Sequence, residues 1–186
     1  GEAFINSLKN TGVRVNIHQV DHGITGECLV LITPDHERTM YTHLGVSSQL
    51  NVEDINQGVI KDSEYLLVEG YLVTSEETKN VASFSLDIAS KHGVKKIITL
   101  SDPNVVKFFR DNILELLNKT FDIIFCNKQE ALNVSKSNNI DDAIDFLKKY
   151  AHEIIITCGE DGAYVTIGNE KFHEIPDSVK PVDLTG

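Results

Sequence analysis

Hydrophobic and polar residues follow two different patterns along this chain of 186 residues. Across residues 13–45 they alternate one by one, which is typical of strands with one covered face. From residue 46 onward, short apolar runs alternate with segments whose apolar positions are three or four residues apart, as in helices. The change of pattern predicts a small antiparallel sheet at 13–45 that lies over another part of the molecule, and an α/β core at 46–186.

Three alternating runs form the first part, after an expected helix that includes Phe4, Ile5 and Leu8. Each run places three side chains on one face. The sets are Val13, Val15 and Ile17, then Cys28, Val30 and Ile32, and finally Met40, Thr42 and Leu44. A turn with Pro34 at its second position separates the last two runs. We therefore expect three short antiparallel strands that expose one face to solvent.

Repeated strand–helix–strand units form the second part. Strands are expected at 64–69, 96–100, 121–126 and 153–157, followed by a hairpin at 163–167 and 171–175. Helices are expected at 52–60, 75–92, 103–117, 130–134 and 141–150. Asn51 is the expected cap of the first helix, a capping box at Thr74–Glu77 starts the second, and Asp102 caps the third. Gly93 is expected to end the second helix. Such units predict an α/β fold with a mostly parallel sheet and helices on both faces.

Polar or glycine-containing groups follow four successive strands at the points where the strands end. They are Glu69-Gly70, Ser101-Asp102, Asn127 and Thr157-Cys158-Gly159. Because parallel strands place their carboxyl ends along one edge of a sheet, we expect these groups to lie near one another. Their convergence predicts a ligand site at that edge.

Asn127 and Glu130 have two interpretations. Three residues apart on one helical turn, they can point the same way, and an amide oxygen with a carboxylate suits Mg²⁺ directly or through its waters. The same spacing is typical of a helix start with Asn127 as N-cap and Glu130 at position N3. Taken alone, the pair favours the cap by roughly three to one, because capping signals are so frequent.

Charge and composition exclude several classes of partner. A net charge of −11 argues against a nucleic-acid or anionic-membrane surface, which needs clustered Lys and Arg. No stretch approaches the length of a membrane span. The cysteines, Cys28, Cys126 and Cys158, form no CxxC pair and predict reduced, buried thiols in a cytoplasmic protein.

Common catalytic motifs are absent from the sequence. GxGxxG, GxxxxGK[ST], HRD and DFG do not occur, which argues against a dinucleotide-binding domain, a P-loop NTPase and a protein kinase. His18 and His22 are four residues apart, but their surroundings predict strand and turn. We give metal binding at this pair roughly one chance in ten.

Six segments together resemble the ribokinase-like (PfkB) family of sugar and nucleoside kinases, in the family's order and over essentially the whole chain. They are TGECLVLITPDHERTMYTHLG from Thr25, YLLVEGYL from Tyr65, LSDPNVV from Leu100, DIIFCNKQEA from Asp122, ITCGEDGA from Ile156 and PVDLTG from Pro181. The similarity is strongest to bacterial adenosine-kinase-like members. It implies ATP-dependent phosphoryl transfer to a primary hydroxyl of a nucleoside, adenosine first. A ribose or other small-sugar kinase, or a binding protein of this fold without the chemistry, remain the alternatives.

The resemblance also assigns roles to residues. Asn127 and Glu130 match the NxxE motif that governs magnesium and phosphate binding, which raises the Mg²⁺ interpretation, although both interpretations can hold at once. Arg38 lies at the GER-like position of a β lid over the acceptor, where His36 replaces the usual Gly. The expected ATP-binding residues are Asp102, Asn127, Thr157, Gly159 and Gly162.

Asp183, Thr185 and Gly186 match the start of the family's D-T-x-G-A-G-D signature, which forms the anion hole, with Leu184 in place of Thr. The family's general base is the last Asp of that signature, and it does not occur in these residues. A positioned base contributes roughly 10²–10⁴ in rate. We therefore expect residues 1–186 to be an incomplete ribokinase-like domain that is inactive alone. The resemblance further implies a homodimer through the lid, whose exposed edge would otherwise be a liability.

Overall fold

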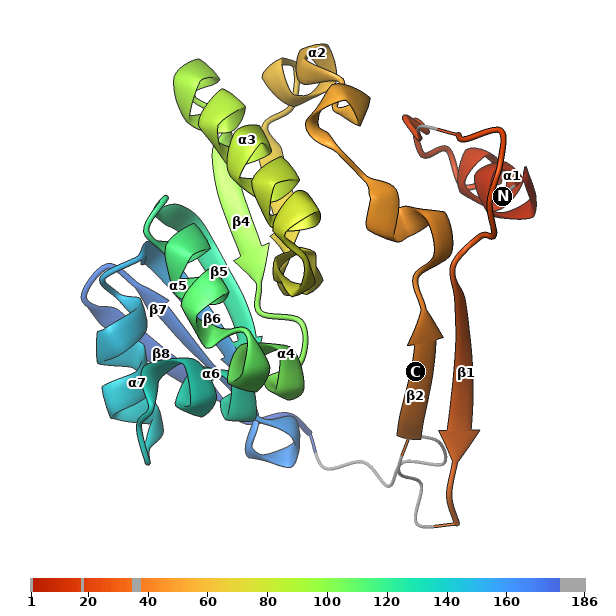
Figure 1. The fold of residues 1–186 in the computed structure, drawn as a ribbon. Coiled ribbons are helices and arrows are strands. Elements are labelled where there is room, and N and C mark those ends of the chain that lie inside the picture. The colour runs from red at the N-terminus through yellow and green to blue at the C-terminus, as the bar shows by residue number, and fades with distance from the viewer. Residues whose placement is uncertain (1, 18, 35–37, 178–186) are drawn as a thin grey trace.

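The computed structural model describes residues 2–17, 19–34 and 38–177. These residues form a six-stranded main sheet with helices packed on it, and a separate two-stranded sheet (Figure 1). The expected α/β class, with a mostly parallel sheet and a small antiparallel sheet, is confirmed. Within the described ranges, no helix is long and apolar enough to cross a membrane.

The small sheet, called the lid sheet below, consists of β1 (Glu27–Ile32) and β2 (Arg38–His43), and helix α1 (Glu2–Asn10) precedes it. The strands are antiparallel, with Glu27 opposite His43. The prediction of a third strand at 13–17 is wrong, because no described segment pairs with that run. The prediction of a covered face is also wrong for the described residues. Every residue of β1 and β2 is exposed, since the lid sheet stands apart from the main sheet (Figure 1). The prediction of a buried thiol is therefore wrong for Cys28, whereas Cys126 is buried.

Short helices join the lid sheet to the core: η1 (Gly45–Gln49), η2 (Val52–Asp54) and α2 (Gln57–Lys61). A single helix was expected over 52–60, with Asn51 as its cap. Asn51 does cap η2, but Asn56 accepts hydrogen bonds from the backbone N–H groups of Gly58 and Val59 and starts a second helix. The expected helix is therefore two short helices, because each asparagine caps a start of its own.

The main sheet follows chain order from β3 to β8, and its first four strands are parallel. The strands are β3 (Tyr65–Glu69), β4 (Lys95–Thr99), β5 (Phe121–Asn127), β6 (Ala151–Thr157), β7 (Ala163–Ile167) and β8 (Glu170–Glu174). The last two form the antiparallel hairpin that the sequence predicts. Each expected strand of this part is confirmed to within a residue or two.

Helices connect the parallel strands. They are η3 (Gly70–Thr74), α3 (Glu76–His92), α4 (Pro103–Phe108), α5 (Arg110–Leu117), α6 (Lys128–Ser135) and α7 (Ile140–Leu147). Two predictions need correction. Ser75, and not a Thr74–Glu77 box, caps α3 by accepting the Thr78 N–H. The helix expected over 103–117 is broken at Phe109, whose ψ of 30° leaves helical geometry.

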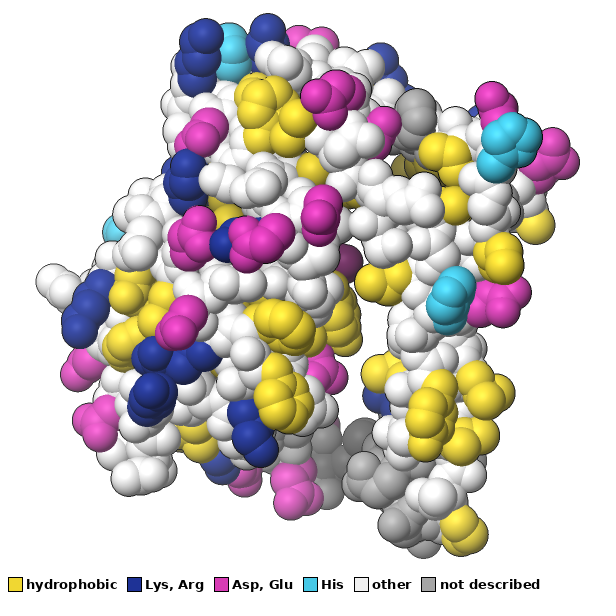
Figure 2. Space-filling model, in the orientation of Figure 1, with side chains coloured by type: hydrophobic (Ala, Val, Ile, Leu, Met, Phe, Trp, Pro, Cys, Tyr) yellow, Lys and Arg dark blue, Asp and Glu magenta, His cyan; other side chains and the backbone are white. Residues whose placement is uncertain are grey.

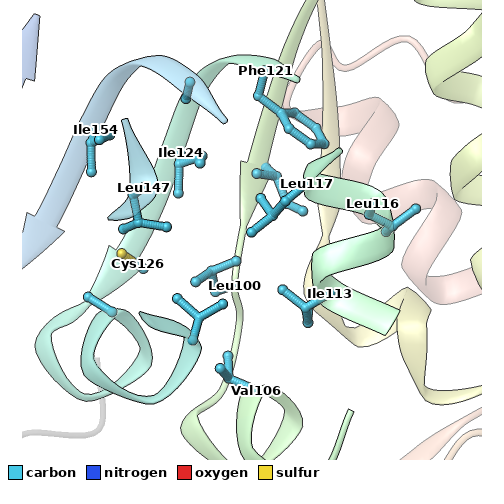
Figure 3. Packing of buried hydrophobic residues seen from close by; sticks show 14 of the residues in the cluster. Leu100, Val106, Ile113, Leu116, Leu117, Phe121, Ile124, Cys126, Leu147 and Ile154 are labelled. Carbon is cyan, nitrogen blue, oxygen red and sulfur yellow. The ribbon is translucent and has the colours of Figure 1, made fainter. Parts of the chain in front are cut away.

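The helices α3 to α7 cover one face of the main sheet, as Figure 1 shows. Crossovers between parallel strands are right-handed. Because β3, β4, β5 and β6 lie side by side in sequence order, every crossover helix falls on the same side of the sheet. Figure 3 shows Leu100, Leu117 and Ile124 packed in this layer. On the other face, Leu67 is 57% and Phe125 39% exposed. The second layer of helices that the sequence analysis expects is therefore not among the described residues.

Candidate functional site

The carboxyl ends of β4, β5 and β6 bring the predicted polar groups to one edge of the main sheet. Asn127, the last residue of β5, lies directly opposite Thr157, the last residue of β6. The Leu100 N–H donates to the Phe125 carbonyl oxygen (3.0 Å), which holds the segment before Asp102 beside β5. The expected convergence of Asp102, Asn127 and Thr157 is present in the structure.

Asp102 starts α4 at this edge. Its Oδ1 accepts the backbone N–H groups of Asn104 (2.7 Å) and Val105 (3.3 Å), and Pro103 follows at the first helical position. The preceding Ser101 has a φ of 72°, in the left-handed region that favours glycine. Such strained residues often lie at functional sites because the surrounding structure must hold them. Ser101 thus turns the chain sharply so that the Asp102 carboxylate sits at the strand end.

Asn127 and Glu130 form the predicted capping box. Asn127 Oδ1 accepts the Glu130 N–H (2.8 Å), and the Asn127 N–H donates to Glu130 Oε2 (3.0 Å). The Asn127 side-chain amide also donates to Glu130 Oε1 (2.8 Å). Each carboxylate oxygen therefore has one partner and keeps one further acceptor position.

Glu130 is only 4% exposed, although it is charged at neutral pH in most settings. Burial raises the pKa of its carboxyl group, the Asn127 N–H opposes this by stabilising the carboxylate, and the negative charge of Asp102 adds to the rise. This edge thus holds two carboxyl groups whose negative charges disfavour each other.

The donors at this edge fit Mg²⁺ that keeps several of its waters. Among the described residues, no group of three or more His, Cys, Asp and Glu side chains could enclose a metal ion. Mg²⁺ normally binds one or two carboxylates and retains water, so a full protein cage is unnecessary. Glu130 and Asn127 could orient such waters through their remaining lone pairs. His22 contributes to no such group, and its partner His18 lies outside the described residues.

The segment after β6 is a tight loop that contains η4 (Gly159–Asp161). The Cys158 N–H donates to the Gly162 carbonyl oxygen (2.7 Å), which closes the loop. Gly162 has a φ of 85°, and a Cβ there would lie 1.9 Å from the Glu174 carbonyl oxygen. Gly159 has a φ of 59°, but a Cβ there would have no atom within 4 Å. Gly162 is therefore needed for packing, whereas the space beside Gly159 is open to a ligand.

Two side chains that the sequence analysis missed brace this loop at Asp161. Lys128 Nζ lies 3.2 Å from Asp161 Oδ2, which links the start of α6 to the loop. His173 Nε2 lies 2.8 Å from the Asp161 carbonyl oxygen, so this nitrogen must donate. The His173 ring stacks on Tyr164, with 4.0 Å between centroids. These contacts join segments far apart in sequence, and no local pattern identifies them.

Tyr71 is a further residue at the edge that sequence reasoning missed. It lies in η3, directly after the Glu69-Gly70 end of β3, and is 46% exposed. Burial raises the pKa of its phenol, and the negative charges of Asp102 and Glu130 raise it further. The phenol therefore stays a hydrogen-bond donor beside the acidic groups. Its position after a strand end is the signal that could have identified it.

The remaining predicted residues are not brought to the edge by the described structure. Arg38 is the first residue of β2 in the lid sheet, opposite Ile32, and is exposed. Asp183, Thr185 and Gly186, the expected start of the anion hole, lie outside the described residues, as does His36. The described site thus consists of Asp102, the Asn127–Glu130 pair and the loop from Thr157 to Gly162.

Comparisons with known proteins identify relatives of this chain and structures with the same fold. Ribokinase from Staphylococcus aureus (strain COL) is 26% identical over 168 residues, a match that covers 87% of this chain and 52% of the ribokinase. Adenosine kinase from Sinorhizobium meliloti superposes with a TM-score of 0.92 at 32% identity, over 100% of this chain and 58% of that one. A protein assigned as ribokinase II from E. coli, in complex with ATP and Mg²⁺, superposes with a TM-score of 0.88 over 100% of this chain and 61% of that one; its 22% identity shows the fold alone.

The chain spans about half the length of the curated relatives that it matches. The sequence profile of the family described as "pfkB family carbohydrate kinase" matches residues 1–186, which is the whole of the chain. The order of the six segments, the strand-end site and this match lead to one conclusion: the chain belongs to the pfkB family of carbohydrate kinases.

Proposed function

We propose that the intact protein transfers a phosphoryl group from ATP to a primary hydroxyl of a nucleoside, with adenosine as the acceptor. The observation that carries this proposal is the convergence of Asp102, the Asn127–Glu130 pair and the Thr157–Gly162 loop at one edge of the sheet. Phosphoryl transfer depends almost entirely on positioning and electrostatic stabilisation, and this edge offers groups for both.

Each part of the edge has a role in this proposal. Asn127 and Glu130 orient the waters of Mg²⁺, which neutralises charge on the phosphates when it is bound. The ATP lies along Thr157 and Gly159, and because Gly159 has no side chain, the phosphates can approach the backbone there. Asp102 fixes the start of α4 beside them.

Residues outside this edge are assigned by the resemblance alone. We propose that Arg38 reaches the substrates from the lid sheet, and that Asp183, Thr185 and Gly186 begin the anion hole of the intact enzyme. The general base would come from a part of the protein beyond these 186 residues. An incomplete site is consistent with a chain that covers about half of its curated relatives.

Two acceptors are supported by different relatives. The match to adenosine kinase from Sinorhizobium meliloti supports adenosine, and the match to ribokinase from Staphylococcus aureus supports ribose or another small sugar. The test is ADP release by the intact protein with Mg²⁺-ATP and either adenosine or ribose. We expect a higher kcat/KM with adenosine and loss of activity with EDTA. A higher kcat/KM with ribose would mean that the acceptor is a sugar and not adenosine. ATP binding without phosphoryl transfer to adenosine or ribose would indicate a binding protein.

We also propose that the protein forms a homodimer through the lid sheet. We propose in addition that it is located in the cytoplasm and binds neither nucleic acid nor membranes. Both strands of the lid sheet are exposed throughout, and exposed strands are normally paired or covered. Light scattering on the intact protein should give twice the mass of one chain. A Leu29→Pro change, which removes a backbone donor from β1, should shift the mass toward that of a monomer. A monomeric native protein would contradict this proposal.

A further inference from the structure

A pocket of about 410 Å³ lies on the helical face of the molecule, between α4 and α6. Pockets that bind small molecules start at roughly 300 Å³. The side chains that line it include Asn104, Lys107, Arg110, Gln129, Asn133 and Lys136. Figure 2 shows basic side chains gathered on the lower part of this face. Asp102, Asn127, Glu130 and the Thr157–Gly162 loop do not line the pocket, which begins beside the first turns of α4 and α6.

The charges that line the pocket are all positive. Lys107, Arg110 and Lys136 contribute three cations, and the lining contains no Asp or Glu. In the described part of the chain, none of these cations forms an ion pair with a carboxylate. This is unusual in a chain with a net charge of −11. Three like charges in one hollow repel one another, and a bound anion would remove that repulsion.

The floor of the pocket is held in place by hydrogen bonds. Arg110 is half-buried, its Nε donates to the Val134 carbonyl oxygen (2.8 Å), and its guanidinium lies over the Phe146 ring. Asn133 donates to the Pro103 carbonyl oxygen (3.1 Å) and accepts from Gln129 Nε2 (2.8 Å). No hydrogen bond to a described group occupies the two terminal nitrogens of Arg110. A fixed guanidinium with these nitrogens free is well suited to bind a phosphate with two hydrogen bonds.

The rim of the pocket can adapt to a ligand. Lys107 and Lys136 are exposed; Lys107 lies in α4, and Lys136 directly follows α6. Their ammonium groups can close on an anion that rests on Arg110. The volume exceeds what a single phosphate needs, and the aliphatic stems of the lysines offer apolar contact to an organic remainder.

We propose that this pocket binds a small phosphorylated metabolite, with its phosphate on Arg110, Lys107 and Lys136, at a site distinct from that of the ATP. Three cations neutralise a multivalent anion such as a phosphate more completely than they would need to for the single charge of a carboxylate. The ligand would connect α4 to α6, the two helices whose first turns are capped by Asp102 and Asn127.

Calorimetric titration of the full chain in Mg²⁺-free buffer tests the proposal, with inorganic pyrophosphate and glucose 6-phosphate as probes. The Lys107→Gln/Lys136→Gln protein should bind both probes at least about tenfold more weakly, since it loses two charge-assisted hydrogen bonds to the phosphate. The matched control is Lys61→Gln/Lys91→Gln, which changes the net charge equally at exposed sites outside the pocket lining. It should change the affinity less than about twofold.

A third variant separates this pocket from the strand-end site. Gly159→Ala places a methyl group in the open space of the loop after β6, meets no atom within 4 Å and lies outside the pocket lining, so it should leave the binding of both probes unchanged. The proposal is overturned if the native chain shows no saturable binding, if the pocket and control pairs weaken binding equally, or if Gly159→Ala alone abolishes it. Weakening of pyrophosphate binding without any effect on glucose 6-phosphate would overturn the assignment to a phosphorylated metabolite.

Discussion

Asn127 and Glu130 hold each other through three hydrogen bonds across the first turn of α6. The Asn127 side chain accepts from the Glu130 N–H, and the Asn127 backbone and side-chain N–H groups each donate to one oxygen of the Glu130 carboxylate. The helix cap and the proposed Mg²⁺ site are therefore the same pair of side chains. The two interpretations of the sequence do not compete, because the capping bonds leave acceptor positions on both carboxylate oxygens.

Replacing Asn127 by Ala should destabilise the protein more than replacing another asparagine cap. Loss of a cap costs about 1 kcal/mol, and Oε1 of the buried Glu130 would in addition lose its bond from the Asn127 side-chain amide, at about 1–3 kcal/mol. Asn139→Ala is the matched control, because Asn139 caps α7 by accepting the Asp142 N–H on the exposed surface. Urea unfolding measures both losses. Only Asn127→Ala should also raise the Mg²⁺ concentration for half-maximal activity; equal effects of the two changes would refute the shared role.

The Glu130→Gln variant should reveal the raised pKa of the native carboxyl group. A raised pKa means that the folded state keeps this proton to a higher pH than the unfolded state. The contribution of the group to the free energy of unfolding is therefore complete below the ordinary glutamate pKa and is lost as the pH rises through the raised pKa. We expect the stability of the native protein, relative to Glu130→Gln, to fall with rising pH across this acidic window. A difference that is constant or rises with pH would contradict the assignment.

Alanine at the two loop glycines should have different effects. Gly159→Ala meets no atom within 4 Å and incurs only the cost of a left-handed conformation, about 1–2 kcal/mol. Gly162 has a φ of 85° and a ψ of −140°, a conformation that is essentially restricted to glycine, and Ala there also meets the Glu174 backbone, which adds about 1–3 kcal/mol. Thermal unfolding should rank Gly162→Ala as the less stable. Gly159→Ala should instead raise the KM for ATP, because its methyl group enters the space proposed for the nucleotide.

His173→Phe should weaken ATP binding with little change in kcat. Phenylalanine can keep the stack on Tyr164 but cannot donate to the Asp161 carbonyl oxygen. Losing that bond costs about 0.5–1.5 kcal/mol, so the KM for ATP should rise roughly two- to tenfold. His152→Phe, at the opposite end of β6, is the control. Steady-state kinetics of the intact protein measure both variants, and an unchanged KM for His173→Phe would show that the brace has no bearing on the nucleotide.

Local signals in the sequence predicted most of the elements and the edge where the site lies. Asp102 with Pro103, Asn127 with Glu130, and Gly93 after α3 all act within one turn of chain, so their spacing is enough to identify them. The strand ends could be placed for the same reason. Parallel strands then bring those ends together without any knowledge of individual contacts.

Features that depend on tertiary contacts were beyond the sequence patterns. The run at 13–17 alternates like a strand, but a strand needs a partner, and no described segment provides one. The break at Phe109 separates two segments that share one apolar spacing. The braces from Lys128 and His173 to Asp161 span 33 and 12 residues, respectively. Each of these is decided by what lies nearby in space.

The order of strands in the main sheet has a consequence for biosynthesis. Each strand from β3 to β8 pairs with its neighbour in the sequence, so no pairing within this sheet waits for a more distant part of the chain. Chains begin to fold from the N-terminal side while they are being made. The described part of the strand-end site comes from one continuous stretch, residues 95–174, including its brace from β8. This edge can therefore assemble on the ribosome as soon as that stretch has emerged. The second face of the main sheet, where Leu67 and Phe125 are exposed, remains available for later packing.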